Sequence, residues 1–235
     1  MPRSIQSLVE EQVAKWRATR APDGRRSSPE FVPPNVITFS NALGSKGLAI
    51  AEAAGKLLGI PVYDREIIEH IAVTKKLRVE SVETLDERVV GRLEDYVTAL
   101  FREKNFDQTD YVRALTRTIM ALWGHGTCVL IGRGGAHIVS RQHSLSVRTT
   151  AGFERRAKTV ARERSLTLEE ATRLVARADA ERRAFIQRHF GVEIDDPQHR
   201  DLILNTGGIG IEQCAEIVAA AFRVKFDRTP ANLSR

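Results

Sequence analysis

The chain has few of the features that mark secreted or membrane proteins. Only two of its 235 residues are cysteines, Cys128 and Cys214, and they show no metal-binding spacing. No apolar run approaches the ~18 residues that a membrane-spanning helix needs, and the first residues lack the apolar core and cleavage site of a signal peptide. We therefore expect a cytoplasmic protein that does not associate with membranes and keeps both cysteines reduced in its core.

Aromatic residues are scarce as well, at 6% of the chain. Proteins that bind single-stranded nucleic acid stack bases on such side chains, so a basic surface that binds nucleic acid is the reading we favour least. The net charge is +6, from 36 basic and 30 acidic residues. This excess suits a protein that binds phosphates, but it is also common on solvated surfaces and decides nothing alone.

Residues 1–20 are expected to form an amphipathic helix. Its apolar side chains recur at helical spacing, namely Ile5, Leu8, Val9, Val13 and Trp16. Residues 21–34 are rich in Pro, Ser and Arg and are predicted to be a linker. An apolar stripe has to be buried, so residues 4–19 either pack on the same chain or in a homodimer, which we favour, or bind a protein partner.

Residues 35–235 alternate between predicted strands and helices. Strands are expected at Val36–Phe39, Ile60–Tyr63, Thr127–Ile131, Leu145–Thr149 and Asp201–Asn205. The intervening segments are largely helical over 66–123, helical at Phe153–Arg164, helical with a break over Thr167–Phe190, and helical at Ile211–Phe226. This alternation predicts an α/β fold in which helices flank a parallel sheet in three layers.

The most informative stretch runs from Asn35 to Gly59. Its apolar strand is followed by a turn of small residues, Ser40–Gly47, and then by a helix that ends at Gly59. Glycines let backbone N–H groups converge on an anion, so this turn is typical of a phosphate-binding loop. The motif G-x-x-x-x-G-K-[ST] is incomplete, because Ser45 replaces the glycine before Lys46 and no hydroxyl residue follows. A strand, turn and helix without a ligand is the alternative.

Two further features lie downstream. The strand that ends at Ile131 runs into a second glycine-rich turn, Gly132-Arg133-Gly134-Gly135. A basic helical segment, Leu174–Gly191, carries four arginines with an aspartate among them. Arginines on a helix usually form a solvated face. Beside two glycine turns at the carboxyl ends of parallel strands, they also supply the charge neutralisation that phosphoryl transfer needs.

The order of these motifs resembles the cytidylate kinase-like family of P-loop nucleoside monophosphate kinases, over roughly residues 35–221. The resemblance is carried by ITFSNALGSKGLAIAEAAGKLLGIPVYDREII, CVLIGRGGAHIV, ARADAERRAFIQRHFG and DLILNTGGIGIEQCAEIV. Each motif is weak alone, but four in the same order indicate the fold. The resemblance implies a P-loop NTPase-type domain at 35–235, with residues 66–123 as a helical acceptor-site insertion and residues 165–191 as a helical lid.

The resemblance also implies an activity and its residues. The activity is transfer of the γ-phosphoryl group of ATP to CMP, dCMP or a related monophosphate, with Mg²⁺ held mainly through phosphates and water. The implied residues at the donor phosphates are Gly44, Ser45, Lys46 and Gly47. The implied catalytic cations are Lys46, Arg177, Arg182 and Arg183, and the implied substrate-binding residues are Asp64, Arg133, Asp179 and Arg188.

The chain departs from the family pattern at two places. Aligning the lysines puts Leu48 at the place of the Mg²⁺-binding Thr, whereas aligning the helices puts Gly47 at the place of the lysine and Ala49 at that of the Thr. An Asp expected soon after the Gly-Arg turn is missing, and Gly134 and Gly135 stand in its neighbourhood. No residue is therefore predicted to bind metal directly.

Two main readings follow from this pattern. The first is an active nucleoside monophosphate kinase in which Lys46 and the lid arginines suffice. The second is a catalytically impaired, kinase-like nucleotide-binding or regulatory module that engages a protein partner through its N-terminal helix.

Overall fold

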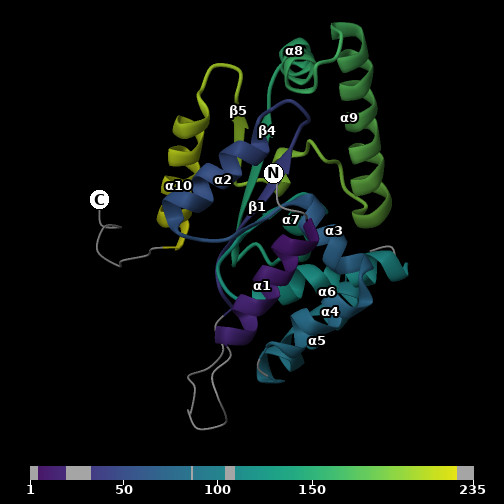
Figure 1. The fold of residues 1–235 in the computed structure, drawn as a ribbon, viewed down its shortest axis with the longest axis vertical. Coiled ribbons are helices and arrows are strands. Elements are labelled where there is room, and N and C mark those ends of the chain that lie inside the picture. The colour runs from purple at the N-terminus through teal and green to yellow at the C-terminus, as the bar shows by residue number, and fades with distance from the viewer. Residues whose placement is uncertain (1–4, 20–32, 86, 104–108, 227–235) are drawn as a thin grey trace.

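Five parallel strands form the central sheet in the part of the chain that the structure describes (Figure 1). The structure is a computed structural model that describes residues 5–19, 33–85, 87–103 and 109–226. The strand order is β2-β3-β1-β4-β5, with β1 Val36–Asn41, β2 Val62–Tyr63, β3 Val129–Ile131, β4 Ser144–Thr150 and β5 Leu202–Asn205. The three central strands are buried on both faces, as parallel strands between helix layers usually are; β1 and β3 are largely apolar, whereas β4 carries buried Ser, Thr and Arg side chains. The predicted parallel α/β fold is confirmed.

Two helices cover one face of the sheet. They are α2 Gly47–Leu58 and α10 Ile211–Phe226, which pack against each other. Ile37 and Phe39 of β1 point into this layer, where they meet Ile50 of α2 and Val218 of α10 in one apolar cluster. This layer supports the turn that follows β1.

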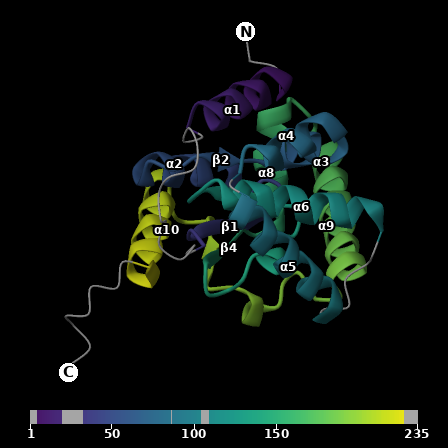
Figure 2. The ribbon, with the colours of Figure 1, turned by 90° about the horizontal axis from the view of Figure 1, so that it is seen from below.

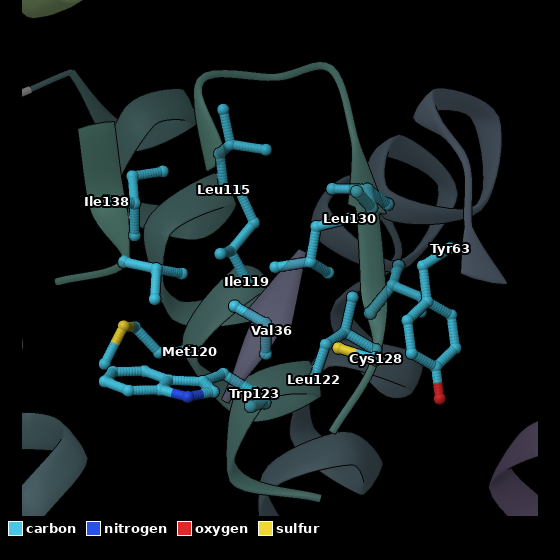
Figure 3. Close-up of a cluster of buried hydrophobic side chains, with 14 of the residues drawn as sticks. Val36, Tyr63, Leu115, Ile119, Met120, Leu122, Trp123, Cys128, Leu130 and Ile138 are labelled. Atoms are coloured by element: carbon cyan, nitrogen blue, oxygen red, sulfur yellow. The ribbon is translucent and has the colours of Figure 1, made fainter. Parts of the chain in front are cut away.

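The opposite face carries a larger helical layer (Figures 1 and 2). Its helices are α3 Arg65–Val73, α4 Lys75–Glu83, α5 Glu87–Glu103, α6 Asp110–Gly124 and the short α7 Gly135–Ile138. Leu115 and Ile119 of α6 are fully buried with Val36 and Leu130 of the sheet (Figure 3). The sheet therefore lies between two helix layers, and the described residues of the predicted helical stretch over 66–123 form four helices.

A pair of helices projects beyond the carboxyl end of the sheet. They are α8 Phe153–Arg164 and α9 Leu168–Phe190, which pack on each other. Helix α9 begins with a capping box, in which the Thr167 hydroxyl accepts from the Glu170 backbone N–H and the Glu170 carboxylate accepts from Thr167. The predicted break in this segment is wrong. The helix is continuous because it contains no glycine or proline before Gly191 ends it in a left-handed conformation.

The N-terminal helix α1, Ile5–Thr19, packs on the body of the same chain against α3. Val9, Val13 and Trp16 are buried there, and the Trp16 ring stacks on that of His125 with centroids 4.1 Å apart. Of the two arrangements that we favoured together, packing on the same chain or in a homodimer, the first is observed for this face. The predicted linker lies outside the described residues up to residue 32.

Both cysteines are buried in the core, Cys128 beside β3 and Cys214 on α10, and neither forms a disulfide. Burial raises the pKa of each thiol above its usual value, which keeps it protonated. Among the helices described, none is long and apolar enough to cross a membrane.

Candidate functional site

The turn between β1 and α2, residues 42–46, is held close to its neighbours by two glycines. Gly44 has a φ of 81°, and a Cβ there would lie 2.5 Å from the carbonyl oxygen of Arg156. A Cβ at Gly47 would overlap the side chains of Asn41 and Thr149. Glycine is required at both places because the backbone passes so close to β4 and α8. The turn therefore exposes backbone N–H groups with little side-chain cover, as a phosphate-binding loop must.

Lys46 is the last residue before α2 begins. Its φ of 58° is a left-handed conformation that glycine adopts far more readily than other residues. In the full motif a glycine directly precedes the lysine. Lys46 thus stands at the place of that glycine and Gly47 at the place of the lysine, as in the second alignment above, where Ala49 replaces the hydroxyl residue. The Lys46 side chain is exposed.

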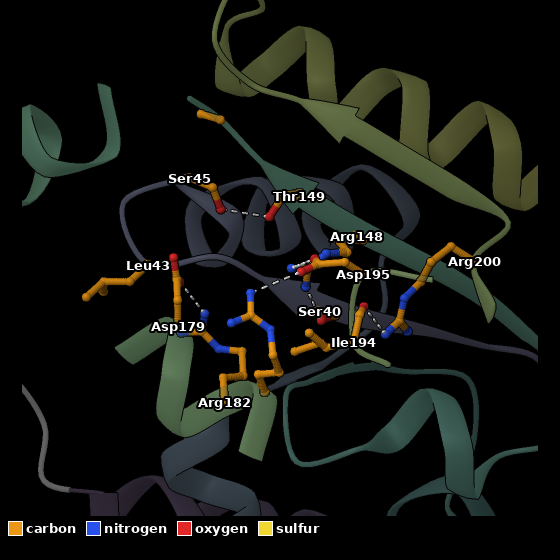
Figure 4. A network of polar contacts seen from close by, with 12 residues as sticks. Ser40, Leu43, Ser45, Arg148, Thr149, Asp179, Arg182, Ile194, Asp195 and Arg200 are labelled. Atoms are coloured by element: carbon orange, nitrogen blue, oxygen red, sulfur yellow. Dashed lines mark hydrogen bonds and ion pairs between the residues drawn. The ribbon is translucent and has the colours of Figure 1, made fainter. Parts of the chain in front are cut away.

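The hydroxyl of Ser45 is engaged beneath this turn (Figure 4). Ser45 is fully buried, and its Oγ lies 3.0 Å from Oγ1 of Thr149 on β4. The Thr206 hydroxyl donates to the backbone carbonyl of Ser45 over 3.0 Å. The backbone N–H of Ser45 also donates to the carbonyl of Ala42 over 3.0 Å. These contacts hold the turn at the ends of β4 and β5, and they leave the N–H groups of the residues on either side of Ser45 to face a ligand.

The second glycine turn, after β3, places Arg133 under α9. The Arg133 guanidinium forms an ion pair with Glu69 of α3 and lies 5.6 Å from the centre of the Phe185 ring. Gly134 follows with a φ of 75°, and a Cβ there would overlap the ring of Phe190. The Phe190 ring therefore fills the space that a side chain at position 134 would need. The aspartate of the family pattern is expected close to this position.

Asp64 begins helix α3 beside this turn. Its Oδ1 accepts a hydrogen bond of 2.8 Å from the backbone N–H of Ile67, which confirms the predicted helix start. The same residue lines the cavity next to Arg133. The Asp64 carboxylate thus caps helix α3 and also borders the candidate site.

Arg156 of α8 ties the first turn to the long helix α9. Its Nη1 and Nη2 atoms donate to the two carboxylate oxygens of Asp179 over 3.1 and 2.7 Å. The same guanidinium donates to the backbone carbonyls of Leu43 and Ala151 over 3.3 and 3.1 Å. Arg182 approaches Asp179 at 3.4 Å. The predicted site residue Asp179 is therefore part of a clamp that closes α9 on the phosphate loop candidate.

Arg148, on β4, forms a second link (Figure 4). Its Nη1 donates to the Ser40 hydroxyl over 2.9 Å, and its Nη2 pairs with Asp195 in the segment that returns from α9 to β5. Arg183 approaches the other oxygen of Asp195 at 3.7 Å. The Asp195 carboxylate thus bridges an arginine of β4 and an arginine of α9.

Arg200 lies buried nearby. Its Nη1 donates to the Ser146 hydroxyl over 3.2 Å. Burial, together with the positive charge of Arg148, lowers the pKa of Arg200 to about 10, so the side chain remains a cation at neutral pH.

These elements enclose a cavity of about 430 Å³, here called the Arg133 cavity. It lies between the turns after β1 and β3, the start of α3 and the second half of α9. Its charged lining residues include Asp64, Arg133, Arg182 and Arg200. Apolar side chains from β1, β3 and α9 line the rest. A cavity of this size with a few convergent polar groups can hold a small organic ligand.

A second cavity of about 440 Å³, here called the Lys46 cavity, lies on the other side of the first turn. Gly44 and Lys46 border it, with Arg155, Lys158 and Arg162 of α8 and the turn after β5. The two cavities thus meet at one turn.

A smaller cavity of about 130 Å³ lies between the first turn and α9. Arg148, Arg156, Arg182 and Arg183 line it. Burial lowers the pKa of Arg182, and the charges of neighbouring arginines lower it further while Asp179 opposes them. Arg182 also lines the Arg133 cavity, so it joins the two spaces.

The structure thus brings together most of the predicted site residues, but not all of them. Arg177 points away from the cavities, with 71% of its side chain exposed and Glu181 at 3.6 Å. Arg188 is exposed and borders none of the three cavities. Roles for these two arginines stay predictions.

Residues 36–208 match the cytidylate kinase-like family. The chain belongs to this family. A crystal structure of an uncharacterized protein from Eubacterium ventriosum ATCC 27560 is similar at a TM-score of 0.65 and 15% identity, over 81% of this chain and 98% of that one. Shikimate kinase from Bacteroides thetaiotaomicron gives a TM-score of 0.41 and 12% identity, over 82% and 98%. No curated protein matches the chain.

The family resemblance led us to expect Mg²⁺ together with a phosphate donor, and the residues at the turn offer few of the ligands that this ion prefers. Mg²⁺ binds oxygen ligands, usually a hydroxyl or carboxylate beside the phosphates. Ser45 has its hydroxyl buried against Thr149, Leu48 and Ala49 have none, and Gly134 faces Phe190. No group of three His, Cys, Asp or Glu side chains suited to a metal was found among the described residues. These residues do not form a protein metal site.

Three buried arginines at the site were not predicted from the sequence, namely Arg148, Arg156 and Arg200. Arg156 follows a predicted strand and opens a helix, a place that could have drawn notice. Arg148 and Arg200 carry no local signal, because their side-chain partners Ser40, Asp195 and Ser146 lie 47 to 108 residues away in the sequence.

Proposed function

We propose that this protein transfers the γ-phosphoryl group of ATP to a nucleoside monophosphate, CMP or dCMP or a related one. The observation that carries the proposal is the position of the first glycine turn between two cavities of similar volume, about 430 and 440 Å³. Direct transfer needs a donor and an acceptor in line on either side of the moving group. The Lys46 cavity would hold the donor and the Arg133 cavity the acceptor.

The chemistry asks little of a covalent catalyst. An oxygen of the acceptor phosphate attacks the γ-phosphorus, and the bond from the γ-phosphorus to the β,γ-bridging oxygen breaks as ADP leaves. Charge on the transferred group is neutralised by backbone N–H groups and arginines. In this proposal the backbone N–H groups of Gly44, Lys46 and Gly47 bind the donor phosphates, while that of Ser45 donates to Ala42 and keeps the turn in shape. Arg182, which lines both the Arg133 cavity and the small central cavity, would stabilise the group in transit.

Arg133 is proposed to bind the acceptor phosphate. Its guanidinium is held under α9 by Glu69 and Phe185, and its Nε is buried without a hydrogen bond within the described residues. A buried donor of this kind costs about 1–3 kcal/mol, which a ligand oxygen would recover. Mg²⁺ would arrive with ATP, held by phosphates and water, and no step is assigned to a protein ligand of the ion.

The test is formation of ADP from ATP with a panel of monophosphates. Arg182→Gln should lower kcat/KM by about 100-fold, roughly the cost of losing one preorganised charge contact in a transition state. Arg173→Gln, on the solvent-exposed side of the same helix, is the matched control and should leave the rate within twofold. No turnover of any monophosphate with Mg²⁺ or Mn²⁺ would contradict the proposal.

A second candidate is a kinase-like protein that binds nucleotide without turnover. It is favoured by Ala49, which offers no hydroxyl to a metal, and by the contact between Gly134 and Phe190. This candidate predicts nucleotide binding by calorimetry with no ADP formed. ADP formation by the unaltered chain separates the two candidates, and Lys46→Ala should lower turnover in an enzyme but change only the nucleotide Kd in a binding module.

The partner assigned to the N-terminal helix remains a proposal. Val9, Val13 and Trp16 are buried on the chain's own body, and Ile5 and Leu8 are the more exposed apolar residues of α1. A homodimer or a protein partner would contact Ile5 and Leu8, or would bind only after α1 detaches from the body. Deleting residues 1–20 should abolish the assembly in either case, and measuring the mass in solution tests this. The proposal also places the protein in the cytoplasm, where nucleotides are abundant.

A further inference from the structure

The Lys46 cavity carries a charge pattern that phosphate binding at the first turn does not by itself require. Lys46, Arg155, Lys158 and Arg162 all border it and are all exposed. Neither a carboxylate nor an aromatic side chain lines it in the part of the chain that the structure describes. Four positive charges thus surround one space of about 440 Å³.

These four cations have no ion-pair partner among the described residues. The arginines on the other side of the turn differ, because Arg133, Arg148, Arg156 and Arg182 each pair with a carboxylate. Even the exposed Arg177 has Glu181 beside it. Like charges gathered without counterions focus a positive potential and concentrate anions in the space between them. The cluster is therefore suited to a ligand with several negative charges.

The same cavity offers little with which to read a base. Two hydroxyls border it, but Thr206 donates to the carbonyls of Ser45 and Thr150, and Thr159 donates to that of Arg155. Apart from the cations, the remaining lining side chains are those of Ala151 and Ile209. A protein selects one base when its own hydrogen-bond donors and acceptors are satisfied by that base and left without a partner by the others. Both hydroxyl protons are already used, so the two threonines can only accept, and among the described residues no side-chain amide, carboxylate or imidazole lines the cavity to tell one base from another.

We propose that the Lys46 cavity binds the phosphate chain of the donor by charge and does not select its base. Inorganic triphosphate and nucleoside triphosphates should then bind alike. Because the cations supply the charge that a protein-bound metal would supply elsewhere, metal-free triphosphate should bind at least as tightly as its Mg²⁺ complex. This inference rests on the proposed function for the identity of the cavity as the donor side, but the binding it describes needs no turnover.

The experiment is calorimetric titration of the full chain with ATP, GTP, inorganic triphosphate and adenosine, in EDTA and in Mg²⁺. We expect the first three to bind with Kd values within about threefold of one another in EDTA, a difference below 1 kcal/mol. Adenosine should not bind. Raising the salt concentration should weaken all three triphosphates by the same factor, because each is held by the same charges.

The variant Lys158→Gln/Arg162→Gln should weaken all three triphosphates by roughly tenfold, about what the loss of two partly screened charge contacts costs. Arg164→Gln, on the same helix and outside the cavities, is the control and should change each Kd by less than twofold. The four cations are exposed, so these variants should fold normally.

Two outcomes would overturn the inference. One is ATP binding more than about tenfold tighter than both GTP and inorganic triphosphate, which shows base selection. The other is no binding of inorganic triphosphate at low salt. If triphosphate binds as expected while no monophosphate is phosphorylated, the proposed kinase activity fails and the charge-based site stands.

Discussion

The Arg133 cavity and the Lys46 cavity flank the same turn and have nearly the same volume, about 430 and 440 Å³, yet they treat charge differently. On the Arg133 side, guanidinium groups of that cavity and of the smaller cavity beside it pair with Glu69, Asp179 and Asp195. On the Lys46 side, four exposed cations have no such partners within the described residues. Paired buried charges are costly to break, whereas unpaired exposed charges are free to act on a ligand. The first set should govern stability and the second set binding.

The largest expected effect comes from breaking the clamp between α8 and α9. Arg156→Met should lower the free energy of unfolding by about 3 kcal/mol, because it leaves the Asp179 carboxylate and the Leu43 carbonyl short of a donor in a buried setting. Chemical denaturation measures this loss. Arg173→Met, whose pair with Glu169 is exposed, should cost less than about 0.5 kcal/mol.

Lys158→Gln is the counterpart from the Lys46 side. It should change the free energy of unfolding by no more than about 0.5 kcal/mol, since an exposed side chain without an ion pair contributes little. A loss as large as that of Arg156→Met would break the comparison between the two sides.

The next effect concerns the close contact beside Arg133. Gly134→Ala should destabilise the fold by about 2–3 kcal/mol, because it adds a clash with the Phe190 ring to the strain of a positive φ. Gly59→Ala is the matched control, since Gly59 has a φ of 68° and no atom within 4 Å of the added Cβ. It should cost only about 1 kcal/mol. Equal losses in thermal unfolding would contradict the packing argument.

A smaller effect, of opposite sign, is expected at the first turn. Lys46→Gly should raise the free energy of unfolding by about 1 kcal/mol, because glycine adopts a φ of 58° without strain. The same change should weaken triphosphate binding, since one of the four cations is lost. Lys46→Ala keeps the strain and removes the charge, so it should weaken binding equally without the gain in stability. Denaturation and calorimetry on both variants separate strain from charge.

The smallest effect is a pH dependence at His125, which lies against α1 and α4. Burial under Trp16 lowers the pKa of His125, although a contact with the Ser81 carbonyl opposes the shift. The folded state then binds the proton less readily than the unfolded state, whose histidine titrates near ~6.5. Stability from this site should be complete above that pH and decline as pH falls through the lowered value. In His125→Gln, denaturation midpoints between pH 5 and 8 should lose this part of the decline.

Much of the fold followed from local pattern. The strand-turn-helix at residues 36–58 appears because an apolar β-branched run, a small-residue turn and a period of 3.6 are all set by neighbours a few residues apart. The same holds for the Asp64 cap and for the Thr167–Glu170 capping box. The prediction of a break in α9 was wrong, because a run of arginines and alanines interrupts the apolar periodicity but these residues still favour a helix.

The site was less predictable than the fold. The sequence pointed to Lys46, Arg133 and Arg182, which line the cavities, because glycine turns and an arginine-rich helix are visible as motifs. It could not rank the arginines of α9. Arg182 has only 26% of its side chain exposed and Arg177 has 71%, although both lie on one helix five residues apart. Which face of α9 turns inward depends on α8 and the sheet.

The sequence by itself determined the order of strands and helices, the two glycine turns and the supply of cations, since each depends on residues close in the chain. The tertiary structure decided which cations are paired and which are left for a ligand. Arg148 meets Ser40 across 108 residues, and Ser45 meets Thr149 across 104. Such contacts arise only when strands and helices pack, because a pattern along the chain fixes which side of an element is apolar but not which partner will face it.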